Sequence, residues 1–134
     1  VHRMGGREVP PVREFLSPEI IREIWQYVEQ VRVDGQLVQY LVDIVEATRP
    51  GPSSGHKFSR FIDFGASPRG SLALFRCSKF EAVLDGRDYV LPEDIKGVAL
   101  SVLRHRIILS YEAEAEGITQ DNVVEMVLGA VPIP

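Results

Sequence analysis

Three proline-containing helix starts constrain the fold of this chain more than any other feature of its sequence. Ser17-Pro18-Glu19 and Ser67-Pro68 place a small polar residue before a proline, and Pro92-Glu93-Asp94 places two acidic residues after one. Proline suits the first position of a helix because its missing amide hydrogen has no partner there, and acidic side chains favour the positive helix end. Apolar residues then recur at intervals of three and four, as on one helix face. The sequence therefore predicts a mainly helical fold.

Five helices are expected, at about residues 17–30, 34–48, 68–85, 92–104 and 120–129, with Ser17, Asp34 and Thr119 as caps. The spacing of apolar residues predicts which face each of the first three helices buries. The predicted core faces are Ile20, Ile21, Ile24, Trp25 and Val28 in the first helix, Leu37, Val38, Leu41, Val42 and Val45 in the second, and Leu72, Ala73, Phe75, Cys77, Phe80, Val83 and Leu84 in the third.

Shorter segments join these helices. Two prolines and two glycines in Arg49–Gly55 predict a loop. The apolar pattern from Phe58 to Phe64 is compatible with one or two helical turns, and Val31–Val33 can pair with Tyr89–Val90 as a short two-stranded ribbon. The predicted fold is thus a small helical bundle of about five helices with a short ribbon.

Composition limits the classes of function. The chain has 134 residues, enough for one domain, and its 45% hydrophobic and 25% charged content is that of an ordinary globular protein. A net charge of −4 gives no general attraction to nucleic acid or to an anionic membrane. No apolar stretch is long enough to span a bilayer, and the single cysteine, Cys77, excludes an internal disulfide. We expect a cytoplasmic protein that binds neither nucleic acid nor membrane.

Motifs for nucleotide hydrolysis and for metal binding are missing from the sequence. No Gly-Lys pair is present, so there is no phosphate-binding P-loop, and no acidic pair ends an apolar strand as in a Walker B motif. The chain is therefore not expected to hydrolyse a nucleotide alone. The three histidines, His2, His56 and His105, are isolated from one another, and no metal site is expected.

Arg69 stands out because it lies in the first turn of the predicted helix 68–85. Free amides and the positive helix end there, together with a guanidinium, suit a phosphate group presented by another surface. A surface ion pair with a carboxylate is the simpler interpretation, and position alone does not decide between them. Ser67 is interpreted as a side-chain cap, and Arg76, two turns further along, as a continuation of a basic strip or a solvated residue. Arg104-His105-Arg106 is interpreted as a helix C-terminal cap.

Several ordered motifs resemble a known family. They are Ala47-Thr48-Arg49-Pro50, Gly65-Ala66-Ser67-Pro68-Arg69-Gly70, Gly86-Arg87-Asp88-Tyr89-Val90, Pro92-Glu93-Asp94-Ile95, Val102–Ile107 and Glu112–Thr119. At this spacing, residues of about 33–130 resemble the C-terminal lid of MoxR-type AAA+ ATPases. One departure is Leu91, which stands where the family usually has Thr or Ser, so the helix at 92–104 lacks a side-chain cap. Another is the loop at 51–64, which is longer than in many members.

The resemblance implies a function for the chain. Residues 17–134 would form the lid, and residues 1–16 a linker from an AAA+ nucleotide-binding core. Arg69 would be the sensor 2 residue that meets the γ-phosphate of ATP, with Ser67 and Pro68 also at the nucleotide. ATP and Mg²⁺ would be held by the whole ATPase, which would be a chaperone-like ring. The partners implied are the core, neighbouring subunits and a von Willebrand factor A domain protein.

Two alternatives come from other classes of protein. The chain could be a stand-alone helical module that binds a protein and never meets a nucleotide. It could also bind DNA through the helix at 68–85, but a pI of about 5.4 and few basic residues on that helix argue against this function.

Overall fold

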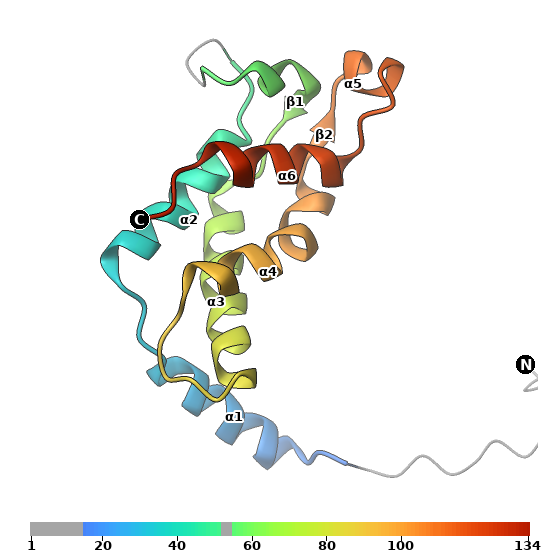
Figure 1. The fold of residues 1–134 in the computed structure, drawn as a ribbon. Coiled ribbons are helices and arrows are strands. Elements are labelled where there is room, and N and C mark those ends of the chain that lie inside the picture. The colour runs from blue at the N-terminus through green and yellow to red at the C-terminus, as the bar shows by residue number, and fades with distance from the viewer. Residues whose placement is uncertain (1–14, 52–54) are drawn as a thin grey trace, which may run out of the picture.

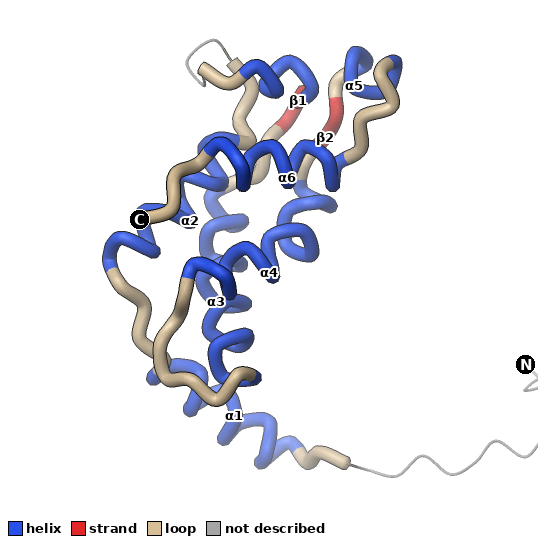
Figure 2. The backbone as a smooth tube through the Cα atoms, viewed as in Figure 1, coloured by secondary structure: helices blue, strands red, loops and turns tan. Residues whose placement is uncertain are grey.

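The computed structural model describes residues 15–51 and 55–134. Apart from Phe15 and Leu16, the linker expected at residues 1–16 lies outside the described residues. Within the described residues the chain forms six α-helices and two short strands, which confirms the mainly helical fold class (Figures 1 and 2). The elements are α1 (Pro18–Gln30), α2 (Gly35–Ala47), β1 (Ile62–Phe64), α3 (Pro68–Leu84), α4 (Pro92–Leu103), β2 (Ile108–Leu109), α5 (Tyr111–Ala115) and α6 (Gln120–Ala130).

The long helix α3 runs through the middle of the domain (Figure 1). Helices α2 and α4 pack against it, and α6 contacts both α2 and α4. The small sheet and α5 lie at the end where α3 begins, whereas α1 lies at the opposite end and contacts α3 there. None of the helices that the structure describes is long and apolar enough to cross a lipid bilayer.

The predicted caps of α1, α2 and α6 are confirmed. The side chains of Ser17, Asp34 and Thr119 each accept a hydrogen bond from a backbone amide in the first turn of their helix. Leu91 precedes α4 and has no side-chain acceptor, as expected from its sequence. The Asp94 carboxylate, in the first turn of α4, instead accepts a hydrogen bond from the Leu91 amide at 2.7 Å. A side chain of the helix itself therefore stabilises this helix start.

The sheet differs from the predicted ribbon. Ile62–Phe64 forms strand β1, after a short 3-10 helix at Lys57–Phe61, and pairs antiparallel with β2. The prediction of helical turns up to residue 64 was therefore wrong for its last three residues. Val31–Val33 and Tyr89–Val90 do meet, but only in one parallel bridge between Arg32 and Tyr89. A longer ribbon is prevented because α2 and α4 begin within a few residues of the bridge.

The buried face of α3 agrees only in part with the predicted one. Ala73, Phe75, Cys77 and Val83 are partly buried and pack against the core, as predicted. Its fully or nearly fully enclosed residues are Gly70, Leu74, Ser78 and Ala82, which repeat every four residues. Leu72 is 59% exposed and Leu84 is 79% exposed, although both were expected in the core. Mostly small side chains face α2 and α4 because the helices pack closely there, so the bulkier apolar residues of α3 lie at the edges of the contact or in solvent.

Helices α1 and α2 also depart from their predicted core faces. In α1 only Val28 is buried, and the other predicted core residues are all more than a third exposed, because α1 packs against α3 through part of its surface. Trp25 contacts the ring of Phe80 edge-on, with ring centroids 4.8 Å apart. In α2 the core includes Tyr40 and Ile44, which the prediction left out, while Val38 is exposed.

Leu74→Ala should lower the free energy of unfolding by about 2–5 kcal/mol, because it removes a fully buried side chain between packed helices. Leu72→Ala is the matched control on the same helix. We expect a change of less than about 0.5 kcal/mol for that exposed residue. Urea unfolding of both variants followed by circular dichroism measures the difference. Equal losses for the two variants would show that the assignment of the buried face is wrong.

Tyr40→Phe should leave the free energy of unfolding unchanged or raise it by up to about 1 kcal/mol. Tyr40 is buried, and its hydroxyl has no hydrogen-bond partner among the described residues. Burial and the negative charge of Glu93 raise the pKa of this hydroxyl. Phenylalanine keeps the packing and removes the unsatisfied polar atom. Thermal and urea unfolding test this, and a loss above about 1 kcal/mol would mean that the hydroxyl is satisfied in solution.

Candidate functional site

Arg69 occupies the second position of α3, at the end of the helix that begins beside the sheet. Its side chain is exposed. Among the residues that the structure describes, no carboxylate pairs with it and no acceptor takes a hydrogen bond from it. The surface ion pair that was the simpler interpretation is therefore not found there. The exposed Arg69 guanidinium therefore has no protein partner in the described chain and lies at the positive end of a helix.

Ser67 and Pro68 lie immediately before Arg69. Ser67 is at the N-cap position of α3, but its hydroxyl makes no capping hydrogen bond, so its interpretation as a side-chain cap was wrong. The backbone takes over this role, since the carbonyl oxygen of Ser67 accepts the amide of Gly70 at 2.7 Å. Pro68 fills the first helical position as predicted. Ser67 and Pro68 are both exposed, and the Ser67 hydroxyl is left without a partner in the described chain.

The residue after Arg69 is buried among three helices. A Cβ atom placed on Gly70 would lie 3.3 Å from Cβ of Ala66, 3.5 Å from Cγ2 of Val45 in α2 and 3.6 Å from Cδ2 of Leu103 in α4. The first turn of α3 is therefore wedged against α2 and α4. Arg69 points outward from a backbone that has little room to move.

The other arginines that the sequence singled out differ in whether they have partners. Arg76 is exposed further along α3 and has no ion pair among the described residues. Arg104 pairs with Asp121 at 3.0 Å, and Nε of Arg106 donates to the carbonyl oxygen of Val102 at 2.9 Å. The interpretation of Arg104-His105-Arg106 as a helix C-terminal cap is thus confirmed for Arg106.

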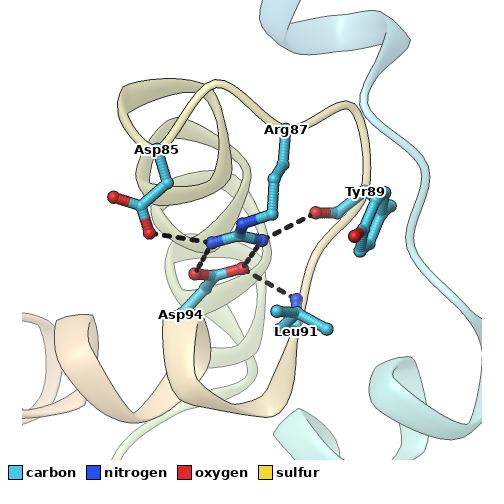
Figure 3. A network of polar contacts seen from close by, with 5 residues as sticks. All are labelled: Asp85, Arg87, Tyr89, Leu91 and Asp94. Atoms are coloured by element: carbon cyan, nitrogen blue, oxygen red, sulfur yellow. Dashed lines mark hydrogen bonds and ion pairs between the residues drawn. The ribbon is translucent and has the colours of Figure 1, made fainter.

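A second polar cluster lies at the other end of α3 (Figure 3). Arg87 follows Gly86, whose positive φ of 74° ends α3 in a turn that suits glycine. The guanidinium of Arg87 donates to both carboxylate oxygens of Asp94, at 2.6 and 2.8 Å, and to Asp85 at 3.0 Å. It also donates to the carbonyl oxygen of Tyr89 at 3.0 Å. This network ties the loop between α3 and α4 to the start of α4.

The network shifts the pKa values of its members. Burial by itself raises the pKa of Asp94, whose side chain is only 3% exposed. The hydrogen bonds from Arg87 and from the Leu91 amide, with the charge of Arg87, outweigh burial and hold that pKa below its ordinary value. The hydrogen bonds of Arg87 to Asp94 and, after it, to Asp85 raise the pKa of Arg87 further above its ordinary value. Both groups stay charged at neutral pH, and the pair is a structural clamp.

A hollow of about 500 Å³ lies elsewhere on the domain. It is open to solvent and is lined by residues near the end of α2 and by the C-terminal segment, including Arg49, His56 and Val131. None of Ser67, Pro68 and Arg69 lines it. The predicted site residues therefore form an outward-facing edge, which needs another surface to enclose a ligand.

Comparisons with known proteins show the family to which the chain belongs. A sequence profile of the AAA lid domain family matches residues 58–127, which include β1, α3, α4 and most of α6. This chain belongs to the AAA lid domain family. Its relatives include the "Chaperone MoxR1" of Mycobacterium tuberculosis, 36% identical over all of this chain and 36% of that protein. The "Protein MoxR" of Methylorubrum extorquens is 39% identical over 71% of this chain and 29% of that protein.

A solved structure is similar as well. The crystal structure of a "putative ATPase" from Cytophaga hutchinsonii has a TM-score of 0.81 and 42% identity, and the match covers 87% of this chain and 36% of that one. The chain thus spans about a third of the length of the proteins that it matches. The predicted resemblance to the lid of MoxR-type ATPases is confirmed.

Asp94→Asn should lower the free energy of unfolding at pH 7 by about 2 kcal/mol, because it leaves a hydrogen-bonded charge without its partner. The folded-state pKa of Asp94 lies below the unfolded value, so its stabilisation is complete above pH 3.8 and is lost as the pH falls through the folded-state pKa. The variant should therefore lose less stability than the wild type on acidification below pH 3.8. Asp63→Asn, at an exposed carboxylate in β1, is the control and should keep the wild-type acid dependence. Urea unfolding between pH 2 and 7 measures both, and an unaltered acid dependence in Asp94→Asn would contradict the assignment.

Proposed function

We propose that this chain is the lid of a MoxR-type AAA+ ATPase and that Arg69 acts as its sensor 2 arginine, in contact with the γ-phosphate of ATP. The observation that carries this proposal is the state of Arg69: an exposed guanidinium without a carboxylate partner in the described chain, in the first turn of α3. It lies inside the Gly65–Gly70 motif, within the part of the chain that matches the lid family.

The residues at this edge fit a phosphate group. The Arg69 side chain supplies a permanent positive charge and a planar set of donors, which suits two oxygens of one phosphate. The hydroxyl of Ser67 is exposed beside it and takes no part in capping α3. Pro68 carries no amide hydrogen and fixes the backbone ahead of Arg69. No acidic side chain in the described chain pairs with this edge to oppose an anion.

Arg69 would act by stabilising negative charge. A cation held on the γ-phosphate favours the transition state of phosphoryl transfer, where charge builds on the oxygens. The same contact is lost when the phosphate leaves, so the position of the lid would depend on the nucleotide that is bound. The nucleotide, Mg²⁺ and the groups that activate water would be held by an AAA+ core, because this chain has no P-loop and no Walker B motif.

The proposed partners follow from this proposal, in which the core holds the nucleotide and the lid supplies Arg69. The Arg69 edge is open and would be closed by an AAA+ core, either that of the same polypeptide or that of a neighbouring subunit in a ring. The chaperone-like activity of such an assembly, and a von Willebrand factor A domain protein as a partner, belong to the same proposal and rest on the resemblance to the family. The "Chaperone MoxR1" relative supports the chaperone-like part by its name.

A second candidate function is a protein-interaction module with no nucleotide role. The exposed apolar face of α1 favours it, because Ile20, Ile21, Ile24 and Trp25 are all at least 39% exposed and form one stripe. The apolar face of α1 and the Arg69 edge are separate surfaces, since α1 and Arg69 lie at opposite ends of α3. The state of Arg69 separates them, because an interaction module gives no reason for an unpaired arginine at this helix start.

Arg69→Ala in a full-length ATPase that carries this chain should lower kcat for ATP hydrolysis by about 10²-fold. Arg76→Ala is the matched control, because it removes an equally exposed arginine of the same helix about 10 Å further along. We expect wild-type turnover in the control and unchanged folding in both variants. Steady-state turnover is measured over a protein concentration series, with assembly followed by sedimentation.

Full turnover in Arg69→Ala with intact assembly would exclude the sensor role and favour the interaction module. Equal losses in Arg69→Ala and Arg76→Ala would indicate a general effect of removing positive charge.

A further inference from the structure

Thr48 is a buried polar residue that joins two distant segments of the chain. It directly follows α2 and is completely enclosed. Its Oγ1 donates to the carbonyl oxygen of Val45 at 2.6 Å and accepts the amide of Ala66 at 2.9 Å. The first bond fixes the direction of the hydroxyl, so that its lone pair is turned toward Ala66. One hydroxyl therefore links the end of α2 to the loop that leads into α3.

The same two segments also touch through their backbones. A Cβ atom placed on Gly65 would lie 2.3 Å from the carbonyl oxygen of Thr48 and 2.9 Å from the amide nitrogen of Arg49. These distances are far inside van der Waals contact, and the atoms involved are backbone atoms that cannot rotate away. Only glycine allows the loop to lie this close to the end of α2. The hydrogen bond at Ala66 and the close backbone approach at Gly65 thus hold the loop at two adjacent residues.

Arg69 is three residues beyond the Thr48 contact. Gly70, the residue after Arg69, is wedged between Val45 and Leu103. The loop is therefore fixed at Ala66 on one side of Arg69 and at Gly70 on the other. Because the backbone on both sides is held, the place of the Arg69 guanidinium depends on the anchor at Thr48.

Loss of the Thr48 hydroxyl would act first on this loop. The buried amide of Ala66 would have no acceptor, and a buried unsatisfied amide is costly. The loop can regain a partner only by moving, and a move at Ala66 is carried into the first turn of α3.

We propose that Thr48 is a positioning residue, which holds the α3 entry loop so that Arg69 meets its phosphate in the productive place. This inference rests on the sensor role of Arg69 proposed above. It adds the residue that directly follows α2, 21 positions earlier in the sequence, to the residues that act at that site. Thr48 itself is buried and does not contact the nucleotide.

A double-mutant cycle in the full-length ATPase tests the proposal. Thr48→Val keeps the shape of the side chain and removes the hydroxyl, and we expect it to lower kcat by about tenfold, since misplacement of a reacting group by less than 1 Å has effects of this order. Thr48→Ser keeps the hydroxyl and should restore kcat to within about twofold of the wild type. Thr119→Val is the control, because it removes a capping hydroxyl from α6 and should leave kcat unchanged in folded protein.

The cycle separates positioning from a general loss of folded protein. If Thr48 acts through Arg69, adding Thr48→Val to Arg69→Ala should cause no further fall in kcat. If it acts by unfolding part of the sample, the two losses should multiply, because the folded fraction falls equally in both backgrounds. Circular dichroism and sedimentation give the folded and assembled fractions of each variant.

Each other outcome overturns the inference in a recognisable way. Wild-type turnover in Thr48→Val, with a clear loss in Arg69→Ala, leaves the sensor role intact and removes Thr48 from it. Multiplying losses, or a Thr48→Ser variant as slow as Thr48→Val, would show that the hydroxyl does not position Arg69. The same conclusion follows if Thr48→Val does not fold while Thr48→Ser is normal. Wild-type turnover in Arg69→Ala removes the sensor role and this inference together.

Discussion

The close packing of α3 against α2 and α4 is the constraint on which the rest of the domain depends. Most of the residues at this contact are small, so the helices approach closely and leave no space for larger side chains. Gly70 lies where three helices meet, and a Cβ atom added there would lie 3.3 Å from its nearest neighbour. Because the packing fixes α3 along its length, the loops at its two ends are placed as well. Arg69 lies at the first of those ends, and the ion pair between Arg87 and Asp94 lies just beyond the other.

The sequence predicted the class of fold and most helix ends, because these depend on local chemistry. A polar cap, followed in α1 by a proline, acts within one turn, so the starts of α1, α2 and α6 were found within one residue. The Arg69 motif was also visible, since its residues are consecutive. Such features need no knowledge of which elements meet in space.

The errors concern contacts between distant parts of the chain. Apolar spacing selected the large side chains of α3, such as Leu72, although the contact with α2 and α4 is made mainly by small ones. The role of Thr48 could not be found for a similar reason: its partner Ala66 is 18 residues away. The pairing of β1 with β2 joins segments that are still further apart. Only the folded backbone shows which of these segments touch.

The burial of α1 was predicted wrongly for the same reason, because it too depends on contacts with distant parts of the chain. Its periodicity correctly predicted a helix with one apolar face, but the pattern cannot say whether this chain provides the surface that covers the face. Val28 and Trp25, toward the end of α1 that touches α3, find partners there, whereas Ile20 and Ile21 do not. A helical pattern therefore predicts an element more reliably than it predicts burial.

Two arginines at the ends of α3 show how environment, and not residue type, separates a structural role from the sensor role proposed for Arg69. Arg87 is 19% exposed and donates to two carboxylates and a carbonyl, so its hydrogen-bonding capacity is used to hold the loop before α4. Arg69 is exposed and has no such partner in the described chain, yet the backbone on both sides of it is fixed. A rigid backbone lowers the entropy lost when a side chain binds an anion. An unpaired cation on a fixed support is what a phosphate sensor requires, and a structural arginine has no need of either property.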